Sequence, residues 1–303
     1  MIYTVTLNPS IDLVVEVANF QINQINRIER ERKFPGGKGI NVSRVLNTIG
    51  VPSVALGFIG GFTGAFIQGA LESEGIQTDF VKIQEDTRIN IKLKTGKETE
   101  MNAQGPALTE QNIRELYKKL ESLQQGDFLV LAGSIPPSLP KTFYSDLTRM
   151  YRTRGVKVVV DAGGNVLAEV LQNKPFLVKP NHHELSDLFG VAIKTFDEII
   201  SYGKKVVEMG AENVIVSMAG DSALLFTNGE VYKASIPKGE VVNSVGAGDS
   251  LVAGFIGTYA KEQNFSKAFQ MAVASGSATT FSEDLASKEK IDFLFDQVTI
   301  KKI

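Results

Sequence analysis

Two patterns of hydrophobic residues alternate along this chain, one typical of strands and one typical of helices. Short, mostly apolar runs predict buried strands, for example residues 128–132, 156–160 and 213–217. Stretches with apolar residues at helical spacing separate them, for example 109–121 and 195–208. Strands spaced by amphipathic helices indicate a mostly parallel sheet covered by helices on both faces. We therefore expect an α/β, doubly wound fold.

Residues 87–101 have a different pattern, because apolar and polar positions alternate strictly. The apolar positions are Ile89, Ile91 and Leu93, and the polar ones are Arg88, Asn90, Lys92 and Lys94. Such alternation predicts a strand with one basic face, followed by a turn at residues 95–97 and a partner strand. This hairpin is a candidate lid over an anionic substrate, and a solvated strand face is the alternative.

Polar or small residues follow several of the predicted strands. They are Asp12, Ser134, Asp161, Asn181 and Gly220. In sheets of this kind, ligands bind beyond the carboxyl ends of the strands, so these positions are candidates for a binding site. For Asp12, a turn-forming aspartate is the alternative interpretation.

A glycine-rich loop at residues 35–39 precedes a predicted helix that Gly50 closes. Its backbone amides can wrap a polar ligand, and Lys38 adds a positive charge. A flexible surface turn is the alternative interpretation of this loop.

Residues 243–255 read NSVGAGDSLVAGF and predict a second glycine loop that opens a buried helix. The free N–H groups at a helix start attract anions. Asp249 beside such an anion hole is a candidate base that takes a proton from a hydroxyl attacking phosphorus. The alternative is a glycine turn with a helix-capping aspartate. A dinucleotide-binding glycine motif is excluded because Leu251 occupies its third glycine position, and Gly37-Lys38 does not fit a P-loop.

The amino-acid composition excludes several classes of partner and of chemistry but does not identify the function. The 303 residues are 43% hydrophobic and 22% charged, and no linker divides them, so we expect a single domain over residues 1–303. A net charge of −2 gives no general attraction to nucleic acid or to anionic membranes. The absence of cysteine excludes disulfides, thiolate metal sites and cysteine nucleophiles. No signal peptide or apolar run of about 18 residues is found, so we expect a cytoplasmic protein.

Asn181 and Glu184 are three residues apart and share one face of a short predicted helix. Oxygen ligands on that face suit Mg²⁺. The two histidines of the chain, His182 and His183, are adjacent and lack the further ligands that a zinc site needs.

Four segments together resemble the PfkB, or ribokinase-like, carbohydrate kinases. They are GGKGINVSR (36–44), KPNHHEL (179–185), VSMAGDSALL (216–225) and NSVGAGDSLVAGF (243–255). The resemblance implies a ribokinase-like three-layer, doubly wound fold with a small β-sheet lid from about 10–34 and 87–104. It also implies transfer of the ATP γ-phosphate to a sugar hydroxyl with Mg²⁺, and a homodimer formed through the lid.

Within that family, residues 6–12, 87–92 and 132–140 are similar to the branch that acts on hexose phosphates. The activity implied is phosphorylation of fructose 1-phosphate at its 6-hydroxyl, giving fructose 1,6-bisphosphate and ADP. Phosphorylation of tagatose 6-phosphate is the near alternative. A sugar-phosphate-binding protein without activity is disfavoured, because Gly246, Gly248 and Asp249 are all present.

The resemblance also implies roles for individual residues. Asp249 is the expected base, and the amides of Gly246, Ala247 and Gly248 form the expected anion hole. The expected sugar-phosphate ligands are Asp12, Arg27, Gly36, Gly37, Lys38, Asn41, Arg88, Asn90, Lys92 and Ser134. Among these, Lys38, Arg88, Asn90 and Lys92, with Arg27 weaker, are expected at the phosphate.

The expected ATP site comprises Lys179, Asn181, Ser217, Met218, Ala219, Gly220, Asp221, Gly248 and Ser275, with Asn181 and Glu184 near Mg²⁺. Around Asp161 and Ala132 the chain departs from the family pattern, so the role of Asp161 stays open.

Overall fold

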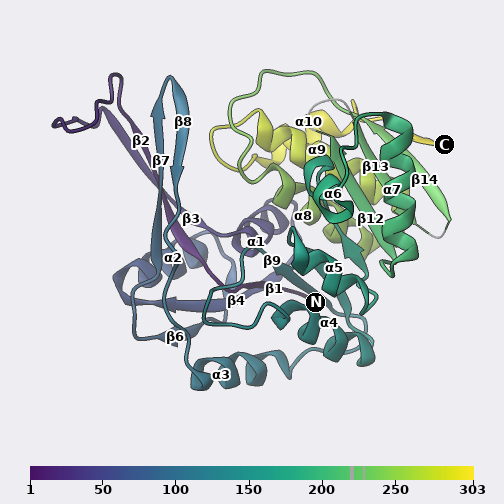
Figure 1. The fold of residues 1–303 in the computed structure, drawn as a ribbon, viewed down its shortest axis with the longest axis horizontal. Coiled ribbons are helices and arrows are strands. Elements are labelled where there is room, and N and C mark those ends of the chain that lie inside the picture. The colour runs from purple at the N-terminus through teal and green to yellow at the C-terminus, as the bar shows by residue number, and fades with distance from the viewer. Residues whose placement is uncertain (219–221, 228) are drawn as a thin grey trace.

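A sheet of 11 strands lies at the centre of the fold (Figure 1). The computed structural model describes residues 1–218, 222–227 and 229–303 of the chain. The parallel strands, in spatial order, are β12 (Asn213–Met218), β11 (Leu177–Val178), β10 (Lys157–Asp161), β9 (Phe128–Ala132), β1 (Ile2–Thr6), β4 (Ser53–Gly60) and β5 (Gln77–Thr78), with β6 (Val81–Ile83) also pairing with β4. One edge continues antiparallel through β13 (Ser222–Thr227), β14 (Glu230–Ser235) and β15 (Ile300–Lys302).

Helices cover both faces of this sheet (Figure 1). One face carries α3 (Glu110–Leu120), α4 (Phe143–Thr153), α5 (Asn165–Leu171), α6 (His182–Phe189) and α7 (Phe196–Glu208). The other carries α1 (Lys38–Thr48), α8 (Ala247–Glu262), α9 (Phe265–Thr280) and α10 (Lys288–Phe295). On β10, Val158 and Val160 enter the first core and Val159 the second, as the alternation of a strand requires. The predicted α/β doubly wound fold is confirmed.

A separate four-stranded sheet forms the lid, at the left of Figure 1. Its order is β3 (Arg30–Gly36), β2 (Ser10–Glu16), β7 (Arg88–Thr95) and β8 (Lys97–Met101). Strands β2 and β7 are parallel, and the other two pairings are antiparallel. Val15, Val17 and Leu93 form a small apolar cluster in this sheet. Helix α2 (Gly61–Ser73) contributes Ile67 and Leu71 to a core that Ile11 of β2 joins, so the lid is anchored at its base.

Several elements differ from their prediction. The loose alternation of residues 13–18 predicts an exposed strand there, whereas strand β2 spans Ser10–Glu16, because Ser10 already pairs with both Gly36 and Arg88. Strand β3 lies at the end of the lid segment expected from about 10–34, where no separate strand was placed, and helix α10 and strand β15 were not predicted as elements. Within residues 1–218, 222–227 and 229–303, no helix combines the length and apolar character needed to cross a membrane.

Candidate active site

A cavity of about 580 Å³ lies between the lid and the carboxyl ends of four neighbouring strands. Asn8 follows β1, Ser134 follows β9, Asp161 ends β10, and Asn181 follows β11. The lid contributes Asp12, Arg88, Asn90, Lys92, Glu100 and Asn102, and the start of α8 contributes Gly246, Gly248 and Asp249. The sheet topology therefore brings most of the predicted site residues to one cavity.

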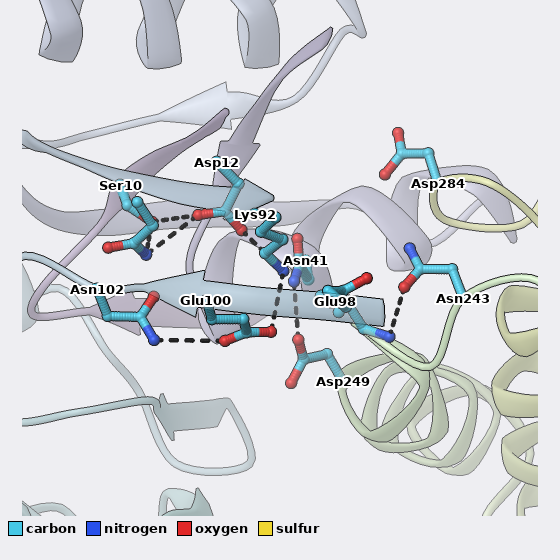
Figure 2. A network of polar contacts seen from close by, with 12 residues as sticks. Ser10, Asp12, Asn41, Lys92, Glu98, Glu100, Asn102, Asn243, Asp249 and Asp284 are labelled. Atoms are coloured by element: carbon cyan, nitrogen blue, oxygen red, sulfur yellow. Dashed lines mark hydrogen bonds and ion pairs between the residues drawn. The ribbon is translucent and has the colours of Figure 1, made fainter. Parts of the chain in front are cut away.

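Asp249 lies in the first turn of α8 and is only 5% exposed. The N-cap of this helix is Gly246, in a left-handed conformation with φ 78°, and the helix has no side-chain cap. The Asp249 carboxylate instead accepts a hydrogen bond of 2.8 Å from Nδ2 of Asn41 (Figure 2). The alternative of a helix-capping Asp249 is therefore wrong, and its carboxylate faces the cavity.

The environment of Asp249 makes it a stronger base than an exposed aspartate. Burial, and then the negative charge of Asp161, raise the pKa of Asp249 to about 6. The charges of Lys38 and Lys179 and the hydrogen bond from Asn41 act in the opposite direction. A carboxylate with this pKa is ionised at neutral pH and takes up a proton more readily than an ordinary one.

Two lysines converge on Asp161, which is 1% exposed. The Nζ atom of Lys38 lies 3.3 Å and that of Lys179 lies 3.4 Å from the same oxygen, Oδ1 of Asp161. Burial alone would raise the pKa of Asp161, but Lys179 and Lys38 hold this pKa below its ordinary value. The pKa of Lys38 is raised, because Asp161, Asp249 and Glu184 together outweigh its burial.

On the lid, Asp12 is fixed by three neighbours (Figure 2). Its carboxylate accepts hydrogen bonds from Oγ of Ser10 at 2.8 Å and Nδ2 of Asn90 at 3.2 Å. Nζ of Lys92 lies 3.7 Å from the same carboxylate and 4.0 Å from that of Glu100. A Cβ atom on Gly36 would fall 2.6 Å from the Asp12 carboxyl, so this close approach requires glycine.

Arg88 joins the base of the lid to the core. Its guanidinium donates to the carbonyl oxygens of Asn8 at 2.9 Å and Ala103 at 2.7 Å, and more weakly to that of Pro9 at 3.4 Å. Three of its five N–H donors are thereby used, which leaves two for a ligand in the cavity.

Asn181 and Glu184 form a capping box at the start of α6. Oδ1 of Asn181 accepts from the Glu184 amide at 2.9 Å, and Oε2 of Glu184 accepts from the Asn181 amide at 2.8 Å. The second carboxylate oxygen of Glu184 lies towards Gly163, at 3.1 Å from where a Cβ atom on that glycine would stand. Within the described ranges, no three His, Cys, Asp or Glu side chains gather as a metal site. The second carboxylate oxygen of Glu184 is a ligand of the kind that Mg²⁺ prefers, and proteins often hold Mg²⁺ by one or two carboxylates together with substrate phosphates.

Comparison with known families matches residues 5–291 to the pfkB family carbohydrate kinases. The chain belongs to this family. It is 52% identical over 303 residues to the 1-phosphofructokinase of Bacillus subtilis, with 100% of both chains covered. It is 37% identical over 301 residues to the D-tagatose-1-phosphate kinase of Bacillus licheniformis, with 99% of both chains covered. The family resemblance and the enzyme class predicted from the sequence are confirmed.

The fold agrees with that of a solved relative. The crystal structure of a putative phosphofructokinase from Staphylococcus aureus superposes with a TM-score of 0.90 at 46% identity. The alignment covers 100% of this chain and 99% of the other.

Six of the expected site residues that the structure describes are not among those that line the cavity. Gly36 lies against the Asp12 carboxyl and Ala247 is the first residue of α8, so both are next to the cavity. The other four lie farther away. Arg27 is exposed in the loop between β2 and β3. Ser217 and Met218 end strand β12, and Ser275 is buried in α9 against α8. Ala219, Gly220 and Asp221, also expected at the nucleotide, lie outside the described residues.

Sequence reasoning missed Glu100, in β8, and Asn102, just after it, which both line the cavity. Nδ2 of Asn102 donates to Glu100 at 3.3 Å, and Glu100 in turn faces Lys92 (Figure 2). The period-two pattern of β8 placed both residues on one face, so a signal was present in the sequence.

Proposed function

We propose that this enzyme transfers the γ-phosphoryl group of ATP to the 6-hydroxyl of fructose 1-phosphate, giving fructose 1,6-bisphosphate and ADP. The observation that carries this proposal is the buried Asp249 carboxylate, which shares one cavity with two lysines and with the polar face of the lid. The choice of sugar is supported by the relative from Bacillus subtilis, named a 1-phosphofructokinase and 52% identical.

Asp249 is the proposed general base. A primary hydroxyl is a weak nucleophile until its proton leaves, and a carboxylate whose pKa is about 6 can accept that proton near neutral pH. The Asn41 hydrogen bond holds the carboxylate in place, so that one oxygen remains available to the sugar.

The transferred group meets positive charge on several sides. The first N–H groups of α8 point out of the helix start and favour an anion. A Cβ atom on Gly248 would lie 3.1 Å from Nζ of Lys179, so this lysine lies directly beside the helix start. Backbone amides and ammonium groups held in place before reaction can stabilise the charge of the transition state.

The lid is the proposed sugar site. Asp12 and Asn90 are suited to the ring hydroxyls, while Arg88 and Ser134 are suited to the phosphate that the sugar already carries. Lys38 and Asn90 were also predicted at that phosphate. Because Lys38 shares Asp161 with Lys179, we assign Lys38 to the transferred group. Because Asn90 donates to Asp12, we assign Asn90 to the hydroxyls. Lys92 was predicted among the phosphate ligands, but its ammonium lies between the carboxylates of Asp12 and Glu100. We therefore assign Lys92 to the hydroxyl side, where it holds Asp12.

Mg²⁺ and ATP occupy the opposite side of the cavity in this proposal. Glu184, with Asn181 beside it, would hold the ion, and Lys179 would contact the ATP phosphates. When bound, Mg²⁺ neutralises charge on the phosphate oxygens and orients them. Because its substrates are ATP and a hexose phosphate, we propose that the enzyme acts in the cytoplasm.

Tagatose phosphates are the second candidate substrates. The relative from Bacillus licheniformis is named a D-tagatose-1-phosphate kinase and is 37% identical. Tagatose 1-phosphate differs from fructose 1-phosphate only in the configuration at C4, so discrimination between these two rests on how Asp12 and Asn90 bind the ring hydroxyls. Tagatose 6-phosphate also carries its phosphate at the other end of the sugar, so its rejection rests on the groups that bind the phosphate as well.

The test is a coupled assay of ADP release with Mg·ATP and four sugars: fructose 1-phosphate, fructose 6-phosphate, tagatose 1-phosphate and tagatose 6-phosphate. We expect the highest kcat/KM with fructose 1-phosphate. A higher kcat/KM with either tagatose phosphate would reject the fructose assignment and leave the kinase chemistry intact.

We also propose a homodimer formed through the lid. The loop between β2 and β3 carries large apolar side chains in solvent, including Ile22 at 81% and Ile25 at 90% exposure. Exposed apolar clusters of this kind mark interaction surfaces. We expect a dimer by light scattering at micromolar concentration, and a monomer for the double variant Ile22→Glu, Ile25→Glu. A monomeric wild-type protein would contradict the proposal.

A further inference from the structure

Asp161 is a buried carboxylate that the proposed mechanism does not yet use. It ends β10 at the floor of the cavity, and its side chain is 2% exposed. Lys38, at the start of α1, and Lys179, just before α6, both place Nζ within 3.4 Å of its Oδ1 atom. Three segments that are distant in sequence thus meet at one oxygen.

The position of Asp161 between Lys38 and Lys179 offsets the repulsion between these two lysines. Two ammonium groups that converge on the path of a phosphoryl group repel each other when no phosphate is bound. A buried carboxylate between them offsets that repulsion, and in return it is itself paired rather than left as an isolated buried charge. Lys179 is only 6% exposed, so little water reaches this lysine to offset the loss of Asp161.

We propose that Asp161 is a positioning residue, which holds the ammonium groups of Lys38 and Lys179 in place for the phosphoryl group and acts on Asp249 through its charge. The proposal rests on the kinase chemistry assigned to Asp249. Asp161 contacts the two lysines and not the reacting atoms.

The charges around Asp249 make this role of Asp161 measurable through the pKa of Asp249. From α1 it faces Lys38 and Asn41, from β10 it faces Asp161, and from the segment before α6 it faces Lys179. Lys92 and Glu100 line the same cavity from the lid. Among these groups Asp161 repels a negative charge on Asp249, while both lysines attract it. Removing the Asp161 charge ends the repulsion and leaves both lysines without their carboxylate, so the pKa of Asp249 must fall.

Asp161→Asn keeps the shape of the side chain and removes its charge. We expect kcat to fall by roughly 10–100-fold, because the lysines lose their fixed geometry. The acid limb of the pH profile of kcat should move to lower pH by about one unit, since a like charge has been removed. Asp127→Asn is the matched control: Asp127 pairs with the amino terminus at the opposite end of the sheet, so both quantities should stay at their wild-type values.

Titration of the Asp249 carboxyl carbon by ¹³C NMR in the free protein gives a second readout that needs no substrate. We expect the pKa of Asp249 to be lower in Asp161→Asn than in the wild type, even if the enzyme prefers another sugar. A folded Asp161→Asn protein with normal kcat and an unmoved titration overturns the proposal. An Asp161→Asn protein that loses thermal stability and activity while the pKa of Asp249 stays unchanged also overturns the proposal, because that result shows a structural role only. If Asp161→Asn does not fold, Asp161→Ser carries the same comparison.

Discussion

Replacing Asp249 by asparagine should change activity and stability in opposite directions. Asparagine has nearly the same shape, and its carbonyl can still accept the 2.8 Å hydrogen bond from Asn41. It cannot accept a proton, so we expect kcat to fall by roughly 10²–10⁴-fold, the usual contribution of a general base. Binding of ATP and the sugar phosphate should persist, because the anion hole is backbone and the proposed sugar contacts lie on the lid.

The stability effect follows from the pKa of Asp249, which is raised from 3.8 to about 6. A raised pKa means that the folded protein favours the protonated carboxyl. This stabilisation is complete below the unfolded pKa and is lost as pH rises through about 6. At pH 7.5 the wild type therefore holds an unfavourable buried charge. A difference of about 2 in pKa corresponds to at most about 3 kcal/mol, at about 1.4 kcal/mol per unit.

We expect the Tm of Asp249→Asn at pH 7.5 to exceed that of the wild type by up to about 6 °C, at roughly 2 °C per kcal/mol for a chain of this size. Near pH 4 the difference should shrink, because the wild-type carboxyl is then protonated. Calorimetry at the two pH values and steady-state kinetics supply the measurements. Asp292→Asn, at an exposed ion pair with Lys288, is the control and should change neither kcat nor Tm. Near-normal kcat in the folded variant, or a Tm below that of the wild type at pH 7.5, would refute the reasoning.

Three further predictions follow from the same cavity. In the wild type, kcat/KM should fall on the acid side with an apparent pKa near 6, because protonated Asp249 cannot act as a base; an acid limb below pH 5 in a pH–rate profile would contradict this. Arg88→Ala should raise KM for the sugar phosphate about tenfold or more and leave KM for ATP little changed, and Arg88→Lys should restore only part of the loss, because lysine cannot copy the planar fork of guanidinium donors. An effect on ATP alone would show that Arg88 is not at the sugar. Gly36→Ala should raise KM for the sugar while the protein stays folded, because the added Cβ atom would lie 2.6 Å from the Asp12 carboxyl; an unchanged KM would show that Asp12 does not contact the sugar.

The sequence predicted the fold class and the place of the cavity, because both depend on local patterns. Uncharged strands spaced by helices imply a parallel sheet, and residues after such strands meet at one edge. Ser134, Asp161 and Asn181 do line one cavity for this reason, whereas Asp12 reaches the cavity from strand β2 of the lid. Strand β15 has no such local signal, since it forms by pairing with the edge strand β14.

The contacts inside the site were beyond sequence reasoning. Lys38 and Asp161 are 123 residues apart, and nothing local to either indicates an ion pair. Lys92 was predicted at the phosphate from its basic strand face and from the family resemblance, and neither could show that two carboxylates flank it. Spacing predicts which face a side chain occupies, but its partners depend on how distant segments pack.

The parallel pairing of β2 with β7 ties the lid to the order in which the chain folds. The two strands enclose residues 17–87, and this stretch contains α1, β4 and α2 of the central layers. Closing so long a loop costs entropy before the pairing repays it, so the enclosed stretch is expected to fold first. The lid side of the cavity, which is the proposed sugar site, would then form only after these parts of the central layers have folded. A newly made chain would thus gain its substrate selectivity late, as one of the last steps of its maturation.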